Sequence, residues 1–204
     1  MGEFSLVQGV KVADLAGIHE CYMTNRIDGQ FRFTINISAE KLITFVKNFC
    51  ITLTEPGFLI LEIPTDESEE QLLRLKKTDP FHCDVYYCDG LSKQTLLEII
   101  EKHGELLIND GMACFGFSSH VSHDELYIGR YKIATIFTSD VNKYKEFIGE
   151  MKIPFEEEIK TVWENFSHDT PGTTSTITVN DKNIYDLTED LKDYGLYFAE
   201  RRVQ

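Results

Sequence analysis

Residues 30–50 read QFRFTINISAEKLITFVKNFC and combine two different hydrophobic periods. From residue 30 to residue 37 every second side chain is apolar, and this period of two predicts a β-strand with one buried face. After Ser38, a preferred helix-capping residue, apolar side chains recur at helical spacing as far as Cys50. The recurring residues are Leu42, Ile43, Phe45, Val46 and Phe49. We therefore expect a strand that leads directly into an amphipathic helix.

A second apolar run, Phe58-Leu59-Ile60-Leu61-Glu62-Ile63, follows the turn-forming residues Glu55-Pro56-Gly57. The run has the length of a strand and is almost continuously apolar, so it predicts a strand that is buried on both faces. We place this strand in the centre of a sheet. At an exposed edge it would instead support a homo-oligomeric scaffold, which is kept as an alternative.

The remainder of the chain alternates between the two patterns. Helices are expected at 66–77, from Leu91-Ser92 to Asn109-Asp110-Gly111, from a cap at Thr138 or Ser139 to residue 151, at 156–166 and at 186–193. Strands are expected at 81–88, 112–117, 125–138, 175–179 and 196–200, with a loop at 167–176.

This order predicts an α/β or α+β fold in which a mixed β-sheet is flanked by amphipathic helices. A purely parallel sheet is disfavoured because residues 112–138 leave no room for a crossover helix. We expect residues 1–204 to form a single globular domain, or two tightly packed α/β halves of about 1–110 and 111–204. No long linker rich in Gly, Ser or Pro separates the halves.

The charge of the chain bears on its partners. It has 34 Asp and Glu against 20 Lys and Arg, and therefore a formal net charge of −14. Such a charge disfavours nucleic acid and anionic membranes and favours a basic protein partner. The N-terminus lacks a basic segment followed by an apolar one, so a cytoplasmic location is expected. Five scattered cysteines fit reduced thiols better than a disulfide framework.

Motifs of common chemistries are absent from the sequence. It contains neither a Gly-x-x-x-x-Gly-Lys nor a Gly-x-Gly-x-x-Gly phosphate-binding loop, and neither a Gly-x-Ser-x-Gly elbow nor a His-Glu-x-x-His helix. We therefore assign no catalytic residue and expect no cofactor. These absences favour a protein that is not an enzyme.

The segment His120-Val121-Ser122-His123-Asp124 is the alternative that keeps an enzyme open. Two imidazoles and a carboxylate within five residues of a loop are potential ligands for a metal ion. A zinc site needs three or four ligands, and His82, Cys83 or Cys114 would have to complete it. The alternative function is therefore a metal-dependent or hydrolytic enzyme that uses His120, His123 and Asp124.

Acidic clusters point instead to a binding protein. They lie at 66–70, 156–158 and 186–193, and an acidic surface accelerates the encounter with a basic partner. Aromatic side chains supply the anchors of many protein interfaces. The candidate contact residues are Glu156, Glu157, Glu158, Trp163 and Phe166.

Residues 153–172 also carry a resemblance to a class of proteins. The pattern consists of Ile153-Pro154, then Trp163-Glu164-Asn165-Phe166, then Pro171-Gly172. It resembles small cytosolic antitoxin or immunity proteins of bacterial polymorphic toxin systems. The resemblance implies an acidic bacterial protein that occludes the active surface of a toxin, and it carries no catalytic residue over to this chain. The oligomeric state is left open.

Overall fold

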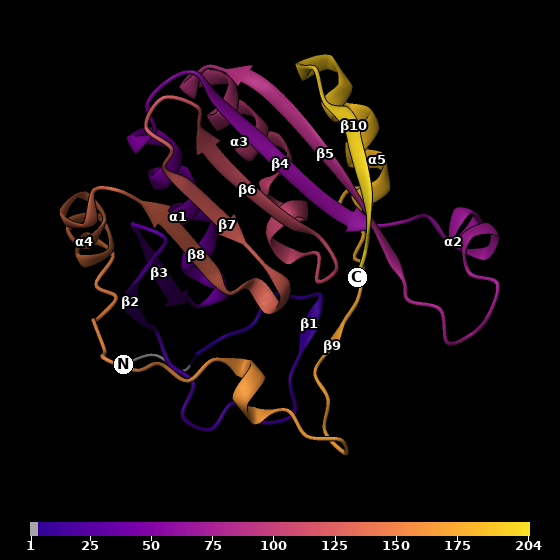
Figure 1. Cartoon of the computed structure of the whole chain (residues 1–204), viewed down its shortest axis with the longest axis horizontal. Helices are drawn as coiled ribbons and strands as arrows, with labels where there is room; N and C mark the ends of the chain where they lie inside the picture. The colour runs from indigo at the N-terminus through magenta and orange to yellow at the C-terminus, as the bar shows by residue number, and fades with distance from the viewer. Residues whose placement is uncertain (1–3) are drawn as a thin grey trace.

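A computed structural model describes residues 4–204. Its main feature is an eight-stranded sheet with the strand order β10-β5-β4-β6-β7-β8-β3-β2, in which every neighbouring pair is antiparallel (Figure 1). The strands are β2 (Cys21–Ile27), β3 (Gln30–Asn36), β4 (Gly57–Pro64), β5 (His82–Leu91), β6 (Cys114–Ser119), β7 (Glu125–Ile128), β8 (Ala134–Thr138) and β10 (Tyr197–Val203). Two short strands, β1 (Val10–Lys11) and β9 (Thr173–Thr174), form a separate ribbon.

Helices cover one face of the large sheet. The two longest, α1 (Ala39–Thr52) and α3 (Lys93–Asn109), pack against each other and against this face (Figure 1). Helices α4 (Val141–Glu150) and α5 (Ile184–Asp190) lie towards opposite ends of the sheet, and α2 (Glu67–Leu73) projects away from the body. None of the helices within residues 4–204 combines the length and the apolar character needed to cross a membrane.

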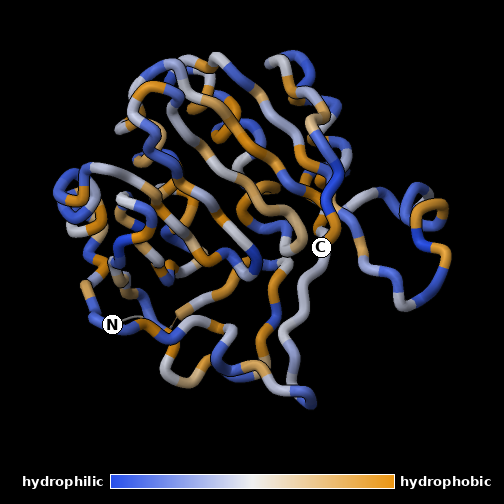
Figure 2. Tube along the Cα trace, in the orientation of Figure 1, coloured by the Kyte–Doolittle hydropathy of each residue, from blue (hydrophilic) through white to orange (hydrophobic). Residues whose placement is uncertain are grey.

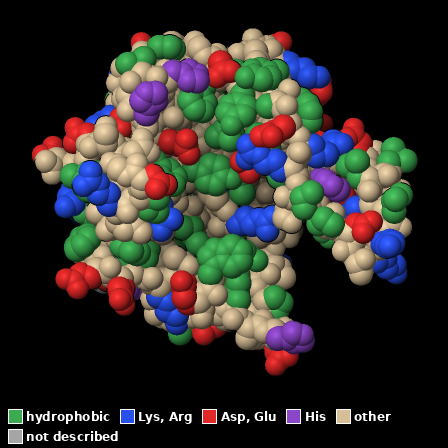
Figure 3. Space-filling model, in the orientation of Figure 1, with side chains coloured by type: hydrophobic (Ala, Val, Ile, Leu, Met, Phe, Trp, Pro, Cys, Tyr) green, Lys and Arg blue, Asp and Glu red, His purple; other side chains and the backbone are tan. Residues whose placement is uncertain are grey.

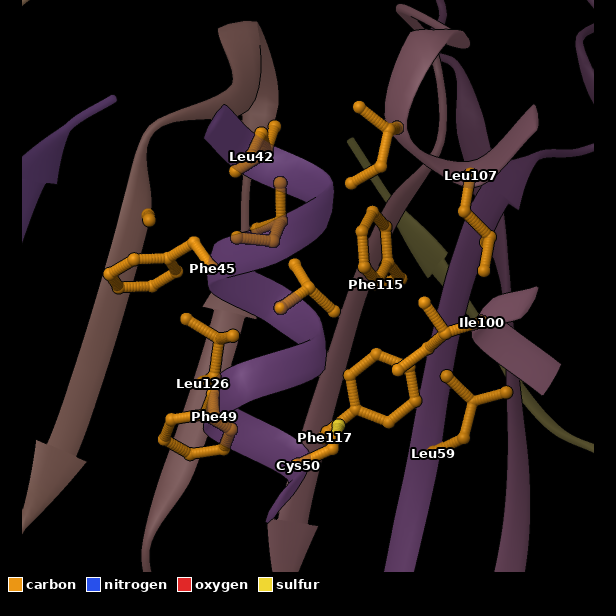
Figure 4. Close-up of a cluster of buried hydrophobic side chains, with 14 of the residues drawn as sticks. Leu42, Phe45, Phe49, Cys50, Leu59, Ile100, Leu107, Phe115, Phe117 and Leu126 are labelled. Atoms are coloured by element: carbon orange, nitrogen blue, oxygen red, sulfur yellow. The ribbon is translucent and has the colours of Figure 1, made fainter. Parts of the chain in front are cut away.

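The core lies between the sheet and helices α1 and α3. Figure 4 shows Cys50 of α1 next to Phe117 of β6, near Phe115, while Phe45 and Phe49 point to the other side of α1; all five are almost completely buried. Complete burial of a large apolar side chain contributes about 1.5–3 kcal/mol, so this layer is the main source of stability. The predicted strand and helix in residues 30–50 are confirmed as β3 and α1.

The predicted α+β class, with helices packed on a β-sheet, is confirmed, but the sheet is antiparallel throughout and not mixed as expected. Strands β6, β7 and β8 lie between β4 and β3, so one sheet contains strands from both 1–110 and 111–204.

Strand β4 is internal, as expected, but its predicted burial on both faces is wrong. Along β4 buried and half-buried residues alternate, because helices cover only one side of it. Figure 2 shows apolar residues concentrated along this strand. All five cysteines are free.

Five other predictions of local structure need correction. The single strand expected at 125–138 is two strands, because Tyr131 and Lys132 adopt positive φ angles and turn the chain. The helix expected at 156–166 is reduced to a short 3-10 helix at Val162–Asn165, and residues 175–179 join neither sheet. Helix α4 is capped by Asp140, whose side chain accepts from the backbone N–H of Lys143, and α2 ends at Leu73.

Lys132 explains why the turn between β7 and β8 forms where it does. Its side chain is buried, and the ammonium donates to the carbonyl oxygens of Leu107 (3.1 Å) and Ala113 (2.7 Å). The turn thereby connects the sheet to the end of α3. Complete burial lowers the pKa of Lys132 from 10.5 to about 8, because the charged form is poorly solvated there.

This pKa makes stability depend on pH in a defined direction. Between pH 8 and pH 10.5 the unfolded chain binds the Lys132 proton more tightly than the folded chain, so unfolding becomes less favourable as pH rises. Relative to Lys132→Met, the native sequence should gain about 2 kcal/mol between pH 8 and pH 10. Urea unfolding of both proteins at the two pH values measures this difference. Equal changes in the two proteins would contradict it.

Candidate functional site

The face of the sheet opposite α1 and α3 is open. Because side chains alternate along a strand, Phe58, Ile60 and Glu62 of β4 point to this face and are half-buried. Strand register places Ile60 opposite Tyr87 of β5. Among residues 4–204 no helix lies over this face, and Figure 3 shows hydrophobic side chains gathered on it around a shallow hollow.

A closed circuit of aromatic and polar groups lies at one end of the open face. The ring of Phe58 stacks on His120 with centroids 4.5 Å apart, and it lies 6.0 Å from the ring of Tyr87. Tyr87 in turn stacks on Tyr197 of β10 at 6.4 Å. Asp89 completes the circuit, since its carboxylate accepts from the Tyr197 hydroxyl (2.7 Å) and lies 3.1 Å from Nε2 of His120. These contacts hold four rings in place at the surface.

Tyr127 occupies the centre of the open face because Gly116 leaves room for it. Gly116 lies opposite both Ile60 and Tyr127. The Tyr127 hydroxyl is placed next to the Glu62 carboxylate and the Cys114 thiol. Burial, followed by these two neighbours, raises the pKa of Tyr127 far above its usual value, so its hydroxyl is a hydrogen-bond donor at every physiological pH.

Glu125 is a charged residue of the open face that has no ion-pair partner within residues 4–204. It lies on β7 opposite Phe137 and Ser118 and is half-buried. Burial, with a smaller effect from Glu62, raises its pKa above 4.5. Glu62 has a cationic neighbour in Arg202 at 3.3 Å, whereas Glu125 forms no ion pair within residues 4–204. A half-buried carboxylate without a cationic neighbour is an attractive position for a cation from outside.

A groove of about 320 Å³ leads from Tyr127 to Trp163. It is lined by Arg32, Arg130 and the threonines of neighbouring strands. At its far end the Trp163 ring packs edge-on against Tyr131 (4.7 Å) and Phe166 (5.3 Å). The aromatic residues of the 153–172 pattern thus come together in space.

The predicted contact residues occupy different environments. Trp163 is 46% exposed, as an anchor would require, and Phe166 is half-buried beside it. Glu157 and Glu158 are exposed, but Glu156 lies 2.7 Å from Nε2 of His19. The acidic clusters at 66–70 and 186–193 are largely used within the chain. They include ion pairs of Glu69 with Arg201, Asp190 with Lys182 and Glu189 with Lys192.

The potential metal ligands of the 120–124 loop do not converge. Asp124 is buried and accepts from the Thr138 hydroxyl (2.6 Å) and the Lys143 ammonium (2.7 Å), which hold its pKa below 3.8 against the effect of burial. His120 belongs to the aromatic circuit, and His123 is exposed. Within residues 4–204, three ligand types meet elsewhere, at His19, Cys21 and Glu156.

The open face is suited to contact rather than to nucleophilic chemistry. Burial raises the pKa of the Cys114 and Cys83 thiols, so both stay protonated at neutral pH. Comparisons with protein-family models, curated proteins and solved structures give no match to this chain. Sequence reasoning missed Tyr87, Glu125 and Tyr127. The alternation Glu125-Leu126-Tyr127-Ile128 was the signal that would have placed Glu125 and Tyr127 on one exposed face.

Gly116→Ala should destabilise the protein by about 1–3 kcal/mol, because the face is already closely packed. A Cβ at Gly116 would lie 2.7 Å from the Leu126 carbonyl oxygen and 2.9 Å from Cγ2 of Ile60. Gly149→Ala in α4 is the matched control, since a Cβ there meets nothing within 4 Å. Thermal unfolding should rank Gly116→Ala below the native protein and Gly149→Ala at or above it. Equal melting temperatures for the two variants would contradict this packing.

Glu125→Gln should stabilise the isolated protein at pH 7. The raised pKa means that ionised Glu125 opposes folding once the pH exceeds 4.5, and the neutral amide removes that opposition. Below pH 4.5 the carboxyl is protonated in both states, so the difference from the native protein should shrink. Melting temperatures at pH 7 and pH 4 measure the effect. A variant less stable than the native protein at pH 7 would show that Glu125 already has a favourable partner.

Proposed function

We propose that this protein is a non-enzymatic binding protein that docks the open face of its sheet onto a basic protein. The observation that carries the proposal is the aromatic face itself. Phe58, Tyr87 and Tyr127 lie half-buried on one side of an eight-stranded sheet that helices cover only on the other. Partly exposed aromatic side chains gathered on one face are typical of interaction sites.

Aromatic anchors and a polar surround are the usual parts of a protein interface. Side chains such as Tyr and Trp contribute most of the binding energy, provided that they are held in place before the partner arrives. The contacts of Phe58 with His120 and of Tyr197 with Asp89 supply this order at one end of the face. At the other end, Trp163 is held by Tyr131 and Phe166.

Charge selects the class of partner. The net charge of −14 attracts a basic protein over long distances and accelerates the encounter. At short range, Glu125 offers a half-buried carboxylate to a lysine or arginine of the partner. This contact would replace the role that the sequence suggested for Glu156, which already has His19 as a neighbour.

Occlusion of a toxin is the specific form of binding that we favour. The residues that resemble antitoxin and immunity proteins include Trp163, which lines the groove on the open face, and Phe166, which packs against Trp163. A bacterial immunity protein of this kind would act by covering the active surface of a basic toxin. It would need neither a cofactor nor a catalytic residue.

Glu125→Gln separates binding from stability, because it should strengthen the fold and weaken the complex. Native protein, Glu125→Gln and the control Glu98→Gln are immobilised and exposed at low salt to extract from the organism that encodes the protein. Glu98 is exposed on α3, in the helical layer, and its replacement removes the same charge. The retained basic protein is then purified and its Kd for each variant is measured by calorimetry.

We expect one basic protein to bind the native protein and Glu98→Gln equally. Loss of one member of a buried charge pair costs about 2 kcal/mol or more, so binding to Glu125→Gln should be at least roughly thirtyfold weaker. Hydrogen exchange in the complex should slow on β4 to β7 and stay unchanged on the outer surface of α1 and α3. Equal Kd values for all three proteins, or retention of no basic protein, would overturn the proposal.

A further inference from the structure

Three potential metal ligands of different chemistry meet at the start of β2. They are Nε2 of His19, Sγ of Cys21 and a carboxylate oxygen of Glu156, and all lie within 4.8 Å of one another. Imidazole, thiolate and carboxylate are the three side-chain groups that bind zinc in proteins. The separation is small enough for one ion to contact all three groups after minor side-chain movement.

The backbone brings these residues together although more than 130 positions separate Glu156 from the other two. The amide of Tyr22 donates to the carbonyl oxygen of Pro154, and the amide of Glu156 donates to the carbonyl oxygen of Tyr22, both at 2.9 Å. Tyr22 and Phe155 form a parallel bridge between these hydrogen bonds. The cluster is thus fixed by main-chain pairing and does not depend on an accidental approach of mobile side chains.

His19 is oriented as zinc-binding histidines usually are. Its Nδ1 lies 3.3 Å from the carbonyl oxygen of Gly17, which can accept the Nδ1 proton. Nε2 faces the Glu156 carboxylate, to which it donates at 2.7 Å, and it would exchange this hydrogen bond for the metal when an ion binds. Ligating histidines commonly donate their other ring N–H to a backbone carbonyl or a carboxylate, which fixes the tautomer and the ring.

We propose that His19, Cys21 and Glu156 bind a zinc ion, with a water molecule in the fourth position. Cys21 is buried and forms the floor of the site, while His19 and Glu156 are 47% and 37% exposed, so an ion can enter from solvent. Binding displaces two protons to solvent, the thiol proton of Cys21 and the Nε2 proton that His19 donates to Glu156, and leaves the thiolate and Nε2 on zinc. Three protein ligands and one open position are characteristic of reactive rather than closed structural zinc sites.

The same three residues do not form a thiol nucleophile with its base. The Cys21 thiol donates to the carbonyl oxygen of His19 (3.5 Å), not to the imidazole ring. Burial, with a contribution from Glu156, raises the pKa of the thiol to about 11. Without a cation the thiol is therefore unreactive at neutral pH.

Cobalt substitution tests the site by absorption spectroscopy, which reports the coordination geometry of the metal and the presence of a thiolate ligand. Purified protein is stripped with a chelator and titrated with Co²⁺ alone. We expect one equivalent to bind, with visible bands of tetrahedral Co²⁺ and an ultraviolet band from thiolate-to-metal charge transfer. Zinc should then displace the cobalt and abolish both signals. Native protein that gives no thiolate band with excess Co²⁺, or no zinc-dependent rise in melting temperature, would overturn the proposal.

Variants identify the ligands. Cys21→Ser should remove the charge-transfer band, and His19→Ala and Glu156→Gln should each weaken zinc binding by more than about tenfold. Cys83→Ser is the matched control, because Cys83 is a half-buried free thiol on another strand and the band should survive its loss. His120→Ala should likewise leave binding unchanged. A band that persists in Cys21→Ser, or that disappears in Cys83→Ser, would assign the metal to another site.

A loss of fold in the variants would be recognised by circular dichroism. The zinc-dependent rise in melting temperature supplies the second readout, since a ligand that binds only the folded state raises stability with the logarithm of its affinity. The rise should be present in Cys83→Ser and reduced in Glu156→Gln. A rise of equal size in Glu156→Gln, Cys21→Ser and Cys83→Ser would exclude His19, Cys21 and Glu156 as the metal site.

Discussion

Burial of a single face of the eight-stranded sheet is the constraint on which the other features of this protein depend. Helices α1 and α3 bring Phe45, Phe49 and their neighbours against one side of the strands, and this contact supplies most of the apolar burial. The period of two then forces every alternate residue onto the opposite side. A sheet with this composition therefore cannot be stable without also presenting Phe58, Ile60 and Tyr127 to solvent, and these residues must be kept soluble by the polar groups between them.

The open face contains a conflict between stability and binding that is localised in one side chain. Burial and Glu62 both oppose the charge of Glu125 and raise its pKa, and no cation within residues 4–204 forms an ion pair with it. Residues that lower the stability of the folded protein are expected on a surface that also binds a partner.

The elements that sequence predicts best are those whose pattern is local. Residues 30–50 specify β3 and α1 because alternation, cap and helical spacing all agree within one short segment. Residues 125–138 fail because the turn there depends on Lys132 reaching the carbonyl oxygens of Leu107 and Ala113, which are distant in sequence. The site follows the same rule. Exposure of Trp163 follows from no local pattern. The contacts of His120 and Asp124 could not be predicted from the sequence because Phe58, Asp89, Thr138 and Lys143 come from other elements.

Residues 153–166 connect the proposed zinc site to the open face, because the segment carries both Glu156 and Trp163. This segment has little regular structure, and contacts with the N-terminal region hold it in place. The Lys160 ammonium donates to the carbonyl oxygen of Ala16 (2.9 Å), and the Asn165 amide donates to that of Asp14 (2.9 Å). A zinc ion on His19, Cys21 and Glu156 would add a further connection between the same two regions. Trp163 lies on this segment, and every connection of the segment limits the movement of Trp163. The Trp163 end of the open face therefore loses less entropy when a partner binds.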